Sequence, residues 1–179
     1  MAIIGAGGPI SLMFQQLALR AGASQVIAVG HSPARLDVAK RLGATHLVNA
    51  KDVDTVTAVR ELTHGYGADV VIECAGIKQA WETSVDVVRR GGRVLWFGGL
   101  PGGTKVEIDA ARVHYGEIAL LNMHGGTVED AREAFDLIVS GAVDVAPMLN
   151  GELPLEQVEL ALKKMIAGEV VKMVIKPES

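Results

Sequence analysis

Three glycines near the start of the sequence stand where a phosphate group could be held. The stretch Gly5-Ala-Gly7-Gly8-Pro9-Ile10-Ser11 directly follows a short apolar run and opens a helical pattern. Glycines let a backbone turn tightly and approach an anion closely, and the free N–H groups at the start of a helix stabilise its negative charge. In this position the glycine-rich turn predicts a pyrophosphate site bordered by Gly5, Gly7, Gly8, Pro9 and Ile10.

The spacing of these glycines differs from the usual dinucleotide pattern G-x-G-x-x-G. Counted forward, the third glycine would be Ile10, and counted back from the helix it would be Ser11, so the turn holds one extra residue. A serine at that place is still small enough for close packing of helix on strand. The pattern leaves open a shifted or weaker pyrophosphate site, or a turn that binds nothing.

The end of the second expected strand bears on which dinucleotide is held. Folds that take NAD usually carry Asp or Glu there, which accepts hydrogen bonds from the adenosine ribose. This sequence has Gly30 instead, followed by His31 and Ser32, with Arg35 one turn into the next helix. The missing carboxylate removes a repulsion of a 2′-phosphate, which Ser32 and Arg35 could bind through a hydroxyl and a guanidinium. The pattern therefore favours NADP slightly over NAD.

Short apolar runs alternate with stretches of helical period, and this order would position the residues above. The expected strands are Ala2–Ile4, Gln25–Val29, His46–Val48, Val70–Ile72, Val94–Phe97 and Ile118–Asn122. Between them apolar residues recur every three or four positions, as helices require. Strands that are apolar throughout and separated by single helices are typical of parallel strands covered on both faces. The sequence therefore predicts an α/β fold with a doubly wound parallel sheet, the Rossmann arrangement.

Residues that typically start or end helices support these elements and indicate the domain organisation. Ser32 before Pro33 predicts a helix start, and glycines at 22, 43, 65, 67, 91 and 92 are expected to end helices in a left-handed conformation. After Asn122 we expect helices at 127–139 and 155–167 and a last strand at 170–175, which risks an unpaired edge. We expect a single Rossmann domain over residues 1–143 and a helix–strand extension over residues 144–179.

Composition excludes several classes of protein. The 179 residues contain no apolar run long enough to span a membrane, and no signal peptide is recognisable. The net charge of −4 leaves no basic field for nucleic acid. The one cysteine, Cys74, has no Cys or His at ligand spacing with which to hold a metal, and it fits a reducing compartment. We therefore expect a soluble, cytoplasmic protein without a metal site of its own.

Several longer stretches carry a resemblance to a known family. They are residues 9–13, 26–29, 32–44, 67–76, 113–118, 127–134 and 151–158. Together they resemble the cofactor domain of zinc-type medium-chain dehydrogenases, the sorbitol and polyol branch above all, over essentially the whole chain. The resemblance implies an NAD(P)-binding domain of an oxidoreductase that transfers hydride between a nicotinamide cofactor and a secondary alcohol or polyol.

The resemblance also implies roles for individual residues. It puts Gly5, Gly7 and Gly8 under the pyrophosphate, Arg35 beside the adenosine ribose, and Lys172 within reach of the pyrophosphate. The nicotinamide and its ribose would lie against the segments that follow the fourth, fifth and sixth strands, which contain Cys74, Ala75, Gly76, Phe97, Gly98, Gly99, Asn122 and His124. All of these positions except Lys172 fall at the carboxyl ends of strands, where open α/β sheets bind ligands.

No residue of this sequence is assigned a catalytic role. In the resembled family the catalytic zinc is held by a separate domain, whose ligand pattern does not occur here, and the extension 144–179 would pack on that domain. The leading interpretation is the cofactor half of a dehydrogenase. A free-standing dinucleotide-binding module and an interaction protein with a decayed site are the alternatives.

A last expectation concerns assembly. In the resembled family two cofactor domains pair edge to edge at the segment that corresponds to residues 104–108. Here Val106 and Ile108 alternate with Lys105 and Glu107, which predicts a strand with one buried face. We expect a homodimer formed through Thr104–Ile108, because pairing would satisfy the exposed N–H and C=O groups of this edge.

Overall fold

A six-stranded parallel sheet forms the body of the protein, as a computed structural model of residues 1–177 describes it. The strands stand in the order β3-β2-β1-β4-β5-β6, and every neighbouring pair is parallel. Their bounds are β1 Ala2–Ile4, β2 Ile27–Gly30, β3 His46–Asn49, β4 Ala68–Glu73, β5 Val88–Trp96 and β6 Ala119–Asn122. Strands β2 and β3 are added on one side of β1, and strands β4 to β6 are added on the other side. This change of strand order between β1 and β4 confirms the predicted doubly wound Rossmann arrangement.

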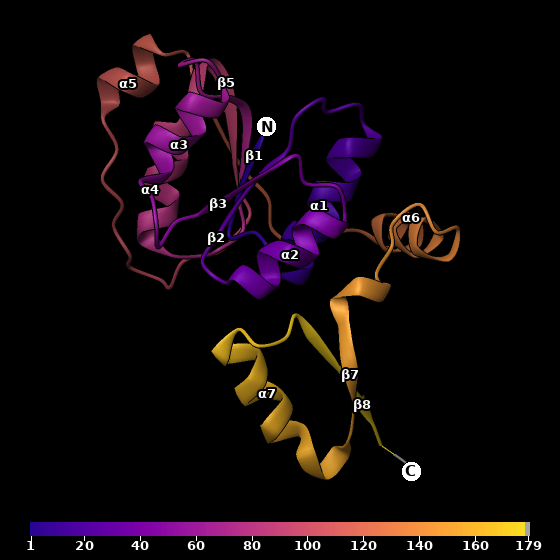
Figure 1. The fold of residues 1–179 in the computed structure, drawn as a ribbon. Coiled ribbons are helices and arrows are strands. Elements are labelled where there is room, and N and C mark those ends of the chain that lie inside the picture. Colours follow the sequence, from indigo (N-terminus) through magenta and orange to yellow (C-terminus); the bar gives the residue numbers. More distant parts are fainter. Residues whose placement is uncertain (178–179) are drawn as a thin grey trace.

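Helices cover both faces of this sheet, with α1 and α2 on one face and α3, α4 and α5 on the other (Figure 1). Their bounds are α1 Pro9–Arg20, α2 Pro33–Arg41, α3 Thr55–Leu62, α4 Lys78–Val87 and α5 Ala110–Tyr115. Two clusters of buried side chains fill the layers. One lies under α3 and α4, and the other lies under α1 and α2. Strands β1 and β2 are buried on both faces, so their runs are apolar at every position.

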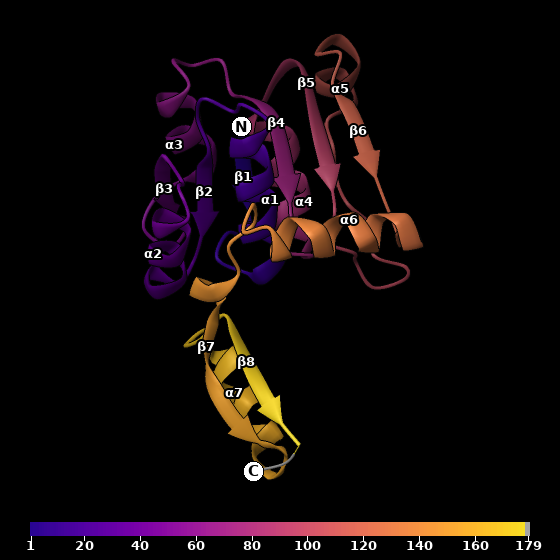
Figure 2. The same ribbon diagram turned by 90° about the vertical axis from the view of Figure 1, so that its right-hand side faces the viewer.

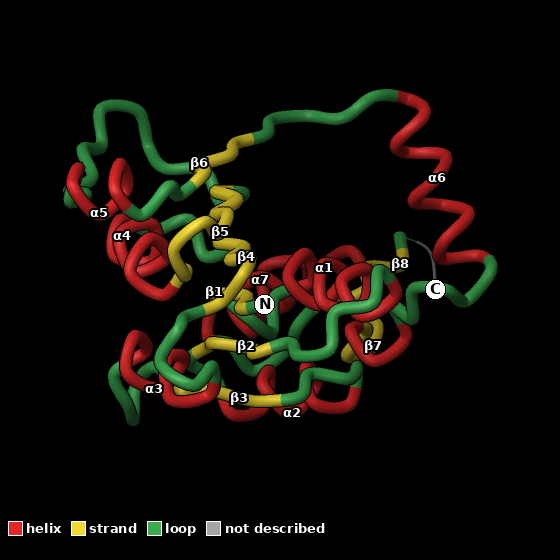
Figure 3. The backbone as a smooth tube through the Cα atoms, turned by 90° about the horizontal axis from the view of Figure 1, so that it is seen from above, coloured by secondary structure: helices red, strands yellow, loops and turns green. Residues whose placement is uncertain are grey.

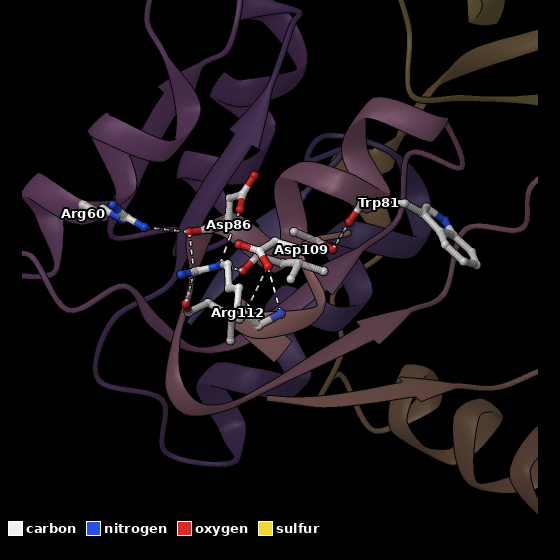
Figure 4. Close-up of polar contacts among 9 residues, drawn as sticks. Arg60, Trp81, Asp86, Asp109 and Arg112 are labelled. Carbon is white, nitrogen blue, oxygen red and sulfur yellow. Dashed lines mark hydrogen bonds and ion pairs between the residues drawn. The ribbon is translucent and has the colours of Figure 1, made fainter. Parts of the chain in front are cut away.

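An arginine fixes α5 to the end of α4 (Figure 4). The guanidinium of Arg112 donates to the backbone carbonyls of Val85, Asp86 and Val88 at 2.8–2.9 Å. These carbonyls lie at the carboxyl end of α4, where helix carbonyls lack intrahelical partners and a positive charge is favourable. Arg60 of α3 also donates to the Asp86 carbonyl, at 3.4 Å, so α3, α4 and α5 meet at this point.

The C-terminal residues form a small unit of their own below the sheet (Figure 1). It contains η1 Ala146–Met148, β7 Leu149–Pro154, η2 Leu155–Gln157, α7 Val158–Ala167 and β8 Lys172–Lys176, and β7 pairs with β8 in parallel. Met148 and Val171 of this unit are buried in the cluster under α1 and α2. Gln16 of α1 holds it as well, because its side chain accepts from the Asp144 N–H at 2.7 Å and donates to the Asp144 carbonyl at 3.0 Å.

Helix α6, Val128–Val139, begins with a capping box between Thr127 and Asp130, yet none of its residues is buried. It crosses in front of the sheet in Figure 2 and stands apart from β5 and β6 in Figure 3. Phe135 and Val139 are 65% and 68% exposed, and Ile166 of α7 is 86% exposed. The apolar sides of both helices are therefore open to solvent in this chain.

The structure corrects three details of the elements predicted from sequence. Gly91 and Gly92 lie inside β5 and do not end a helix, since α4 passes directly into β5 and the pairing with β4 shifts register there. Residues 104–108 pair with no strand of the described chain. Strand β7 was not predicted. It pairs with one edge of β8, the last strand, in a sheet of two strands. Among the described residues, no helix is long and apolar enough to cross a membrane.

Candidate functional site

A cavity of about 580 Å³ lies at the carboxyl ends of β1, β2 and β4, between the start of α3 and the side of α4. Eight of the residues singled out from the sequence line it, namely Gly5, Gly8, Gly30, His31, Ser32, Arg35, Cys74 and Ala75. They come from three separate stretches of chain, which meet because parallel strands end at the same edge of the sheet. The volume is in the range that small ligands and cofactors occupy.

The glycine loop is fixed to β2 and leaves the start of α1 open. The N–H groups of Gly5 and Ala6 both donate to the Val29 carbonyl, at 3.0 and 2.8 Å. Gly5 and Gly7 take φ values of +84° and +92°, a region that favours glycine. Gly8 is the N-cap of α1, and no side chain caps the helix. The N–H groups of the first helical turn therefore remain free for an anion.

Ser11 takes the place of the third glycine of the usual pattern, as expected. Its side chain is 2% exposed, and the hydroxyl donates to the Gly8 carbonyl at 2.8 Å. The serine thus ties the extra residue of the loop to the first turn of α1. Close packing of α1 on the sheet is retained without a glycine at this position.

Polar side chains at the end of β2 and the start of α2 are hydrogen-bonded to the C-terminal unit. Ser32 caps α2 as expected, accepting from the Arg35 N–H at 3.5 Å, and its hydroxyl donates to the Gly168 carbonyl at 3.3 Å. The Arg35 guanidinium is hydrogen-bonded to backbone carbonyls of the C-terminal unit. Both residues border the cavity, while the Ser32 hydroxyl and three of the five N–H donors of Arg35 have partners within the chain.

A buried carboxylate joins the loops that follow β4 and β5. Glu73 is fully buried at the end of β4, and its Oε1 accepts from the N–H groups of Ala75 and Gly76 at 2.6 and 2.9 Å. Its backbone carbonyl accepts from the N–H groups of Phe97 and Gly98, both at 3.0 Å. The second carboxyl oxygen, Oε2, has no hydrogen-bond partner among the described residues. Glu73 thus holds two loops that were predicted to lie beside the nicotinamide, one through its side chain and the other through its backbone carbonyl.

Burial changes the ionisation of two neighbouring groups at this place. Burial raises the pKa of the Glu73 carboxyl above its ordinary value of 4.5, and the hydrogen bonds from Gly76 and Ala75 oppose that shift. Burial, with a smaller contribution from the Glu73 charge, raises the pKa of the Cys74 thiol to about 12. Cys74 is therefore a neutral, unreactive thiol near pH 7.

A second cavity of about 360 Å³ lies beyond the ends of β5 and β6. Phe97, Gly99, Asn122 and His124 line it, as does the loop from Leu100 to Val106. Trp81 of α4 and Trp96 of β5 form another wall, with their rings stacked at 4.3 Å. Trp81 donates its indole N–H to the Gly98 carbonyl at 2.7 Å. The structure thus gathers four predicted residues here, apart from the larger cavity.

The remaining predicted residues line neither cavity. Gly7, Pro9, Gly76 and Gly98 adjoin residues that do. Ile10 lies in the first turn of α1, and Lys172 lies on β8 in the C-terminal unit. Its neighbour Val171 is buried in the same cluster as Ala6 of the glycine loop. The role of each of these residues toward a cofactor stays a prediction.

Sequence reasoning missed the outer wall of the large cavity. This wall is formed by the start of α3 and the first turns of α4, with Asp54, Thr55, Val56, Ile77, Gln79, Ala80 and Thr83. The position of these residues in the sequence could have revealed them. Residues that follow β3 and β4 must border the same crevice as those that follow β1 and β2, because all these strands are parallel. Among the described residues no group of three or more His, Cys, Asp or Glu side chains could hold a metal ion.

The sequence and the fold match known proteins over nearly the whole chain. The family model described as zinc-binding dehydrogenase matches residues 9–140. The L-threonine 3-dehydrogenase of Bacillus subtilis (strain 168) is 35% identical over 98% of this chain and 50% of its own length. The sorbitol dehydrogenase of the same organism is 29% identical over 99% of this chain and 50% of its own length.

Solved structures give the same result. A putative zinc-binding dehydrogenase from Sinorhizobium meliloti 1021, bound to NADP, superposes with a TM-score of 0.91 and 32% identity. The match covers 98% of this chain and 52% of that one. An alcohol dehydrogenase zinc-binding domain protein from Burkholderia ambifaria superposes with a TM-score of 0.89 and 30% identity, over 99% and 48% of the two chains. The chain thus spans about half the length of the relatives it matches.

Proposed function

Because this chain belongs to the zinc-binding dehydrogenase family, we propose that it binds a nicotinamide dinucleotide for hydride transfer to or from a secondary alcohol or polyol. The observation that carries the proposal is the cavity at the strand ends. It joins an uncapped helix start and a glycine loop to a crevice large enough for the adenosine half of the cofactor. The bound dinucleotide would supply the hydride acceptor or donor.

Each part of the cofactor has a matching surface in this proposal. The pyrophosphate lies on the Gly5–Gly8 loop, where the free N–H groups at the start of α1 stabilise its charge. The adenine enters the cavity between Asp54 and Ile77. The nicotinamide reaches the loops that Glu73 holds, toward Asn122 and His124 of the second cavity. The described residues thereby bind and orient the cofactor.

We propose NADP in preference to NAD. Position 30 carries no carboxylate that would repel a 2′-phosphate, and Arg35 borders the cavity at that end. The similar structure from Sinorhizobium meliloti 1021 is one bound to NADP. Of the described residues that line the cavity, Arg35 alone has a permanent positive charge.

The zinc chemistry of the family would come from a part of the protein outside this sequence. The described residues do not fit a zinc ion, since they bring no three ligand side chains together. The exposed apolar sides of α6 and α7 are the surfaces that such a part would cover. We therefore expect this chain alone, purified with or without added zinc, to bind cofactor without oxidising alcohols.

Assembly as a homodimer through Thr104–Ile108 remains part of the proposal. The Glu107 N–H is bonded to Glu82 of α4 at 2.7 Å, whereas the Val106 N–H has no partner among the described residues. Successive N–H groups of an extended segment point to opposite sides. One edge of the segment is thus fixed to α4, and the other is open to a second copy.

Calorimetric titration of the chain with NADPH, NADH and ADP-ribose tests the function. We expect all three to bind, NADPH most tightly, and Gly7→Val to abolish binding. A Cβ on Gly7 would come within 2.5 Å of the Arg35 Cβ and displace the loop. Gly102→Ala is the control, because a Cβ there meets open space. If the wild type bound none of the three at millimolar concentration, the proposal would fail and an interaction protein with a decayed site would be favoured.

A further inference from the structure

The strongest tie between the cofactor end of β2 and the C-terminal unit is a single side chain, Arg35. Its Nη2 donates to the carbonyls of Met165 and Val170, both at 2.7 Å, and its Nε donates to the Val170 carbonyl at 3.2 Å. These two carbonyls flank Gly168, the left-handed residue that ends α7. Ser32 adds its hydroxyl bond to the Gly168 carbonyl.

This arrangement caps the carboxyl end of α7 at Met165 and fixes the turn that follows the helix at Val170. The last carbonyls of a helix lack intrahelical partners and carry the negative end of its dipole, so a guanidinium is favourable there. Arg112 makes the same kind of cap on α4 and does not line the cavity. Arg35 differs from Arg112 because it also borders the cavity.

Three of the five N–H donors of Arg35 are used by the carbonyls, and only the two on Nη1 are left. A phosphate is bound best by a fork of two parallel N–H groups, and such charge-assisted bonds are about twice as strong as those to neutral acceptors. Every fork of a guanidinium includes either Nη2 or Nε. A 2′-phosphate in the cavity would therefore draw donors away from the end of α7.

We infer that Arg35 is shared between two competing acceptors, the 2′-phosphate of a bound dinucleotide and the carboxyl end of α7. The inference rests on the proposed function and adds that the phosphorylated cofactor loosens the attachment of the turn from α7 to β8. A dinucleotide without the 2′-phosphate leaves that attachment in place. The preference for NADP is then set by how firmly the C-terminal unit holds Arg35.

Thermodynamic linkage makes this coupling reciprocal, so it can be approached from both sides. One side is the addition of a nucleotide, and the other is a substitution that loosens the C-terminal unit, for which Asn150 is suitable. Its Oδ1 accepts from the N–H groups of Val171 and Lys172, at 2.6 and 3.2 Å, and so holds the start of β8. Asn150 does not line the cavity. Asn150→Ala should loosen the α7–β8 turn, free Arg35, and tighten binding of the 2′-phosphate alone.

The test uses 2′,5′-ADP and 5′-AMP, which differ only in the 2′-phosphate. Hydrogen exchange at residues 165–171 is followed in the free chain and with each nucleotide at saturation. We expect 2′,5′-ADP to speed exchange of these amides about fivefold or more, within the range of common couplings, and 5′-AMP to leave it unchanged. In Arg35→Ala the exchange should be fast with or without nucleotide, while in Arg112→Ala it should respond as in the wild type.

The second arm measures affinity. Asn150→Ala should bind 2′,5′-ADP several-fold more tightly than the wild type and 5′-AMP equally well. If 2′,5′-ADP binds but exchange at 165–171 stays constant, or if Asn150→Ala leaves the ratio of the two affinities unchanged, the sharing of Arg35 is wrong while cofactor binding stands. If neither these nucleotides nor NADH and NADPH bind the wild type, the proposed function itself fails.

Discussion

The carbonyl oxygen of Ala6 lies 2.7 Å from the point where a Cβ on Gly30 would stand. Any side chain at position 30, an acidic one included, would therefore collide with the backbone of the glycine loop. The bond from the Ala6 N–H to the Val29 carbonyl anchors this part of the loop at the end of β2, and no side chain fits beneath the Ala6 carbonyl. The absence of a carboxylate at this place has a steric cause within the chain.

A first prediction follows for Gly30→Asp, the substitution that would normally introduce a preference for NAD. We expect it to lower the free energy of unfolding by about 1–3 kcal/mol, as overpacking does, and to weaken NADH binding because the loop must shift. Urea unfolding and calorimetry measure the two effects. Gly102→Asp, where the new Cβ meets open space, is the matched control. A stable Gly30→Asp chain that binds NADH more tightly would contradict this account.

The second prediction concerns the buried carboxyl of Glu73, whose raised pKa makes stability depend on pH. A carboxyl that is harder to ionise in the folded state contributes stability that is complete below its ordinary pKa of 4.5 and is lost as the pH rises through its folded-state pKa. In Glu73→Gln that loss should disappear. Above pH 4.5, the difference in free energy of unfolding between Glu73→Gln and the wild type should therefore change with pH. The change should be at most about 1.4 kcal/mol per pH unit.

Urea unfolding at a series of pH values measures this slope. Glu61→Gln on the exposed side of α3 is the control and should follow the wild type. A Glu73→Gln profile parallel to the wild type throughout would show that the buried carboxyl titrates as it does in the unfolded chain.

A third prediction is that Cys74 resists alkylation in the folded chain. Its pKa of about 12 leaves only about one thiol in ten thousand ionised at pH 8, and only the thiolate reacts. Mass spectrometry after treatment with iodoacetamide should show the folded chain unmodified and the urea-unfolded chain fully modified. Modification of the folded chain at the rate of free glutathione would refute the raised pKa.

The fourth prediction tests the dimer edge. Val106→Pro removes the N–H that faces away from α4, so it should convert a dimer to a monomer in light scattering. Lys105→Pro removes an N–H on the side of Glu107, toward α4, and should leave the dimer in place. A monomeric wild type, or equal behaviour of the two proline variants, would show that residues 104–108 are not the interface.

The strands and the glycine loop that borders the cavity could be predicted because they depend on local patterns. Apolar runs such as Ile27–Val29 must be buried, and a glycine-rich turn between a strand and a helix indicates an anion-binding site. Strand β7 could not be predicted, since Leu149–Pro154 is largely exposed and is a strand only because β8 lies beside it. The same limit applied to Arg35, whose carbonyl partners lie 130 and 135 residues further along the chain.

The fate of Ser32 shows where a motif is insufficient. Its role as the cap of α2 depends only on residues close to it in the sequence and was predicted correctly. Its second bond, to the Gly168 carbonyl, depends on how the C-terminal unit docks. The types of residue at the end of β2 were thus readable from the sequence, while the partners of their polar groups required the fold.

The stacked pair of Trp81 and Trp96 provides the chain with an optical probe of its own. These are its only two tryptophans, and their rings lie 4.3 Å apart with an angle of 11° between the planes. At such a separation the indole transitions couple, so near-ultraviolet circular dichroism reports the geometry of the pair. Since Trp81 is bonded to the Gly98 carbonyl, movement of the loop after β5 alters that spectrum without any added label.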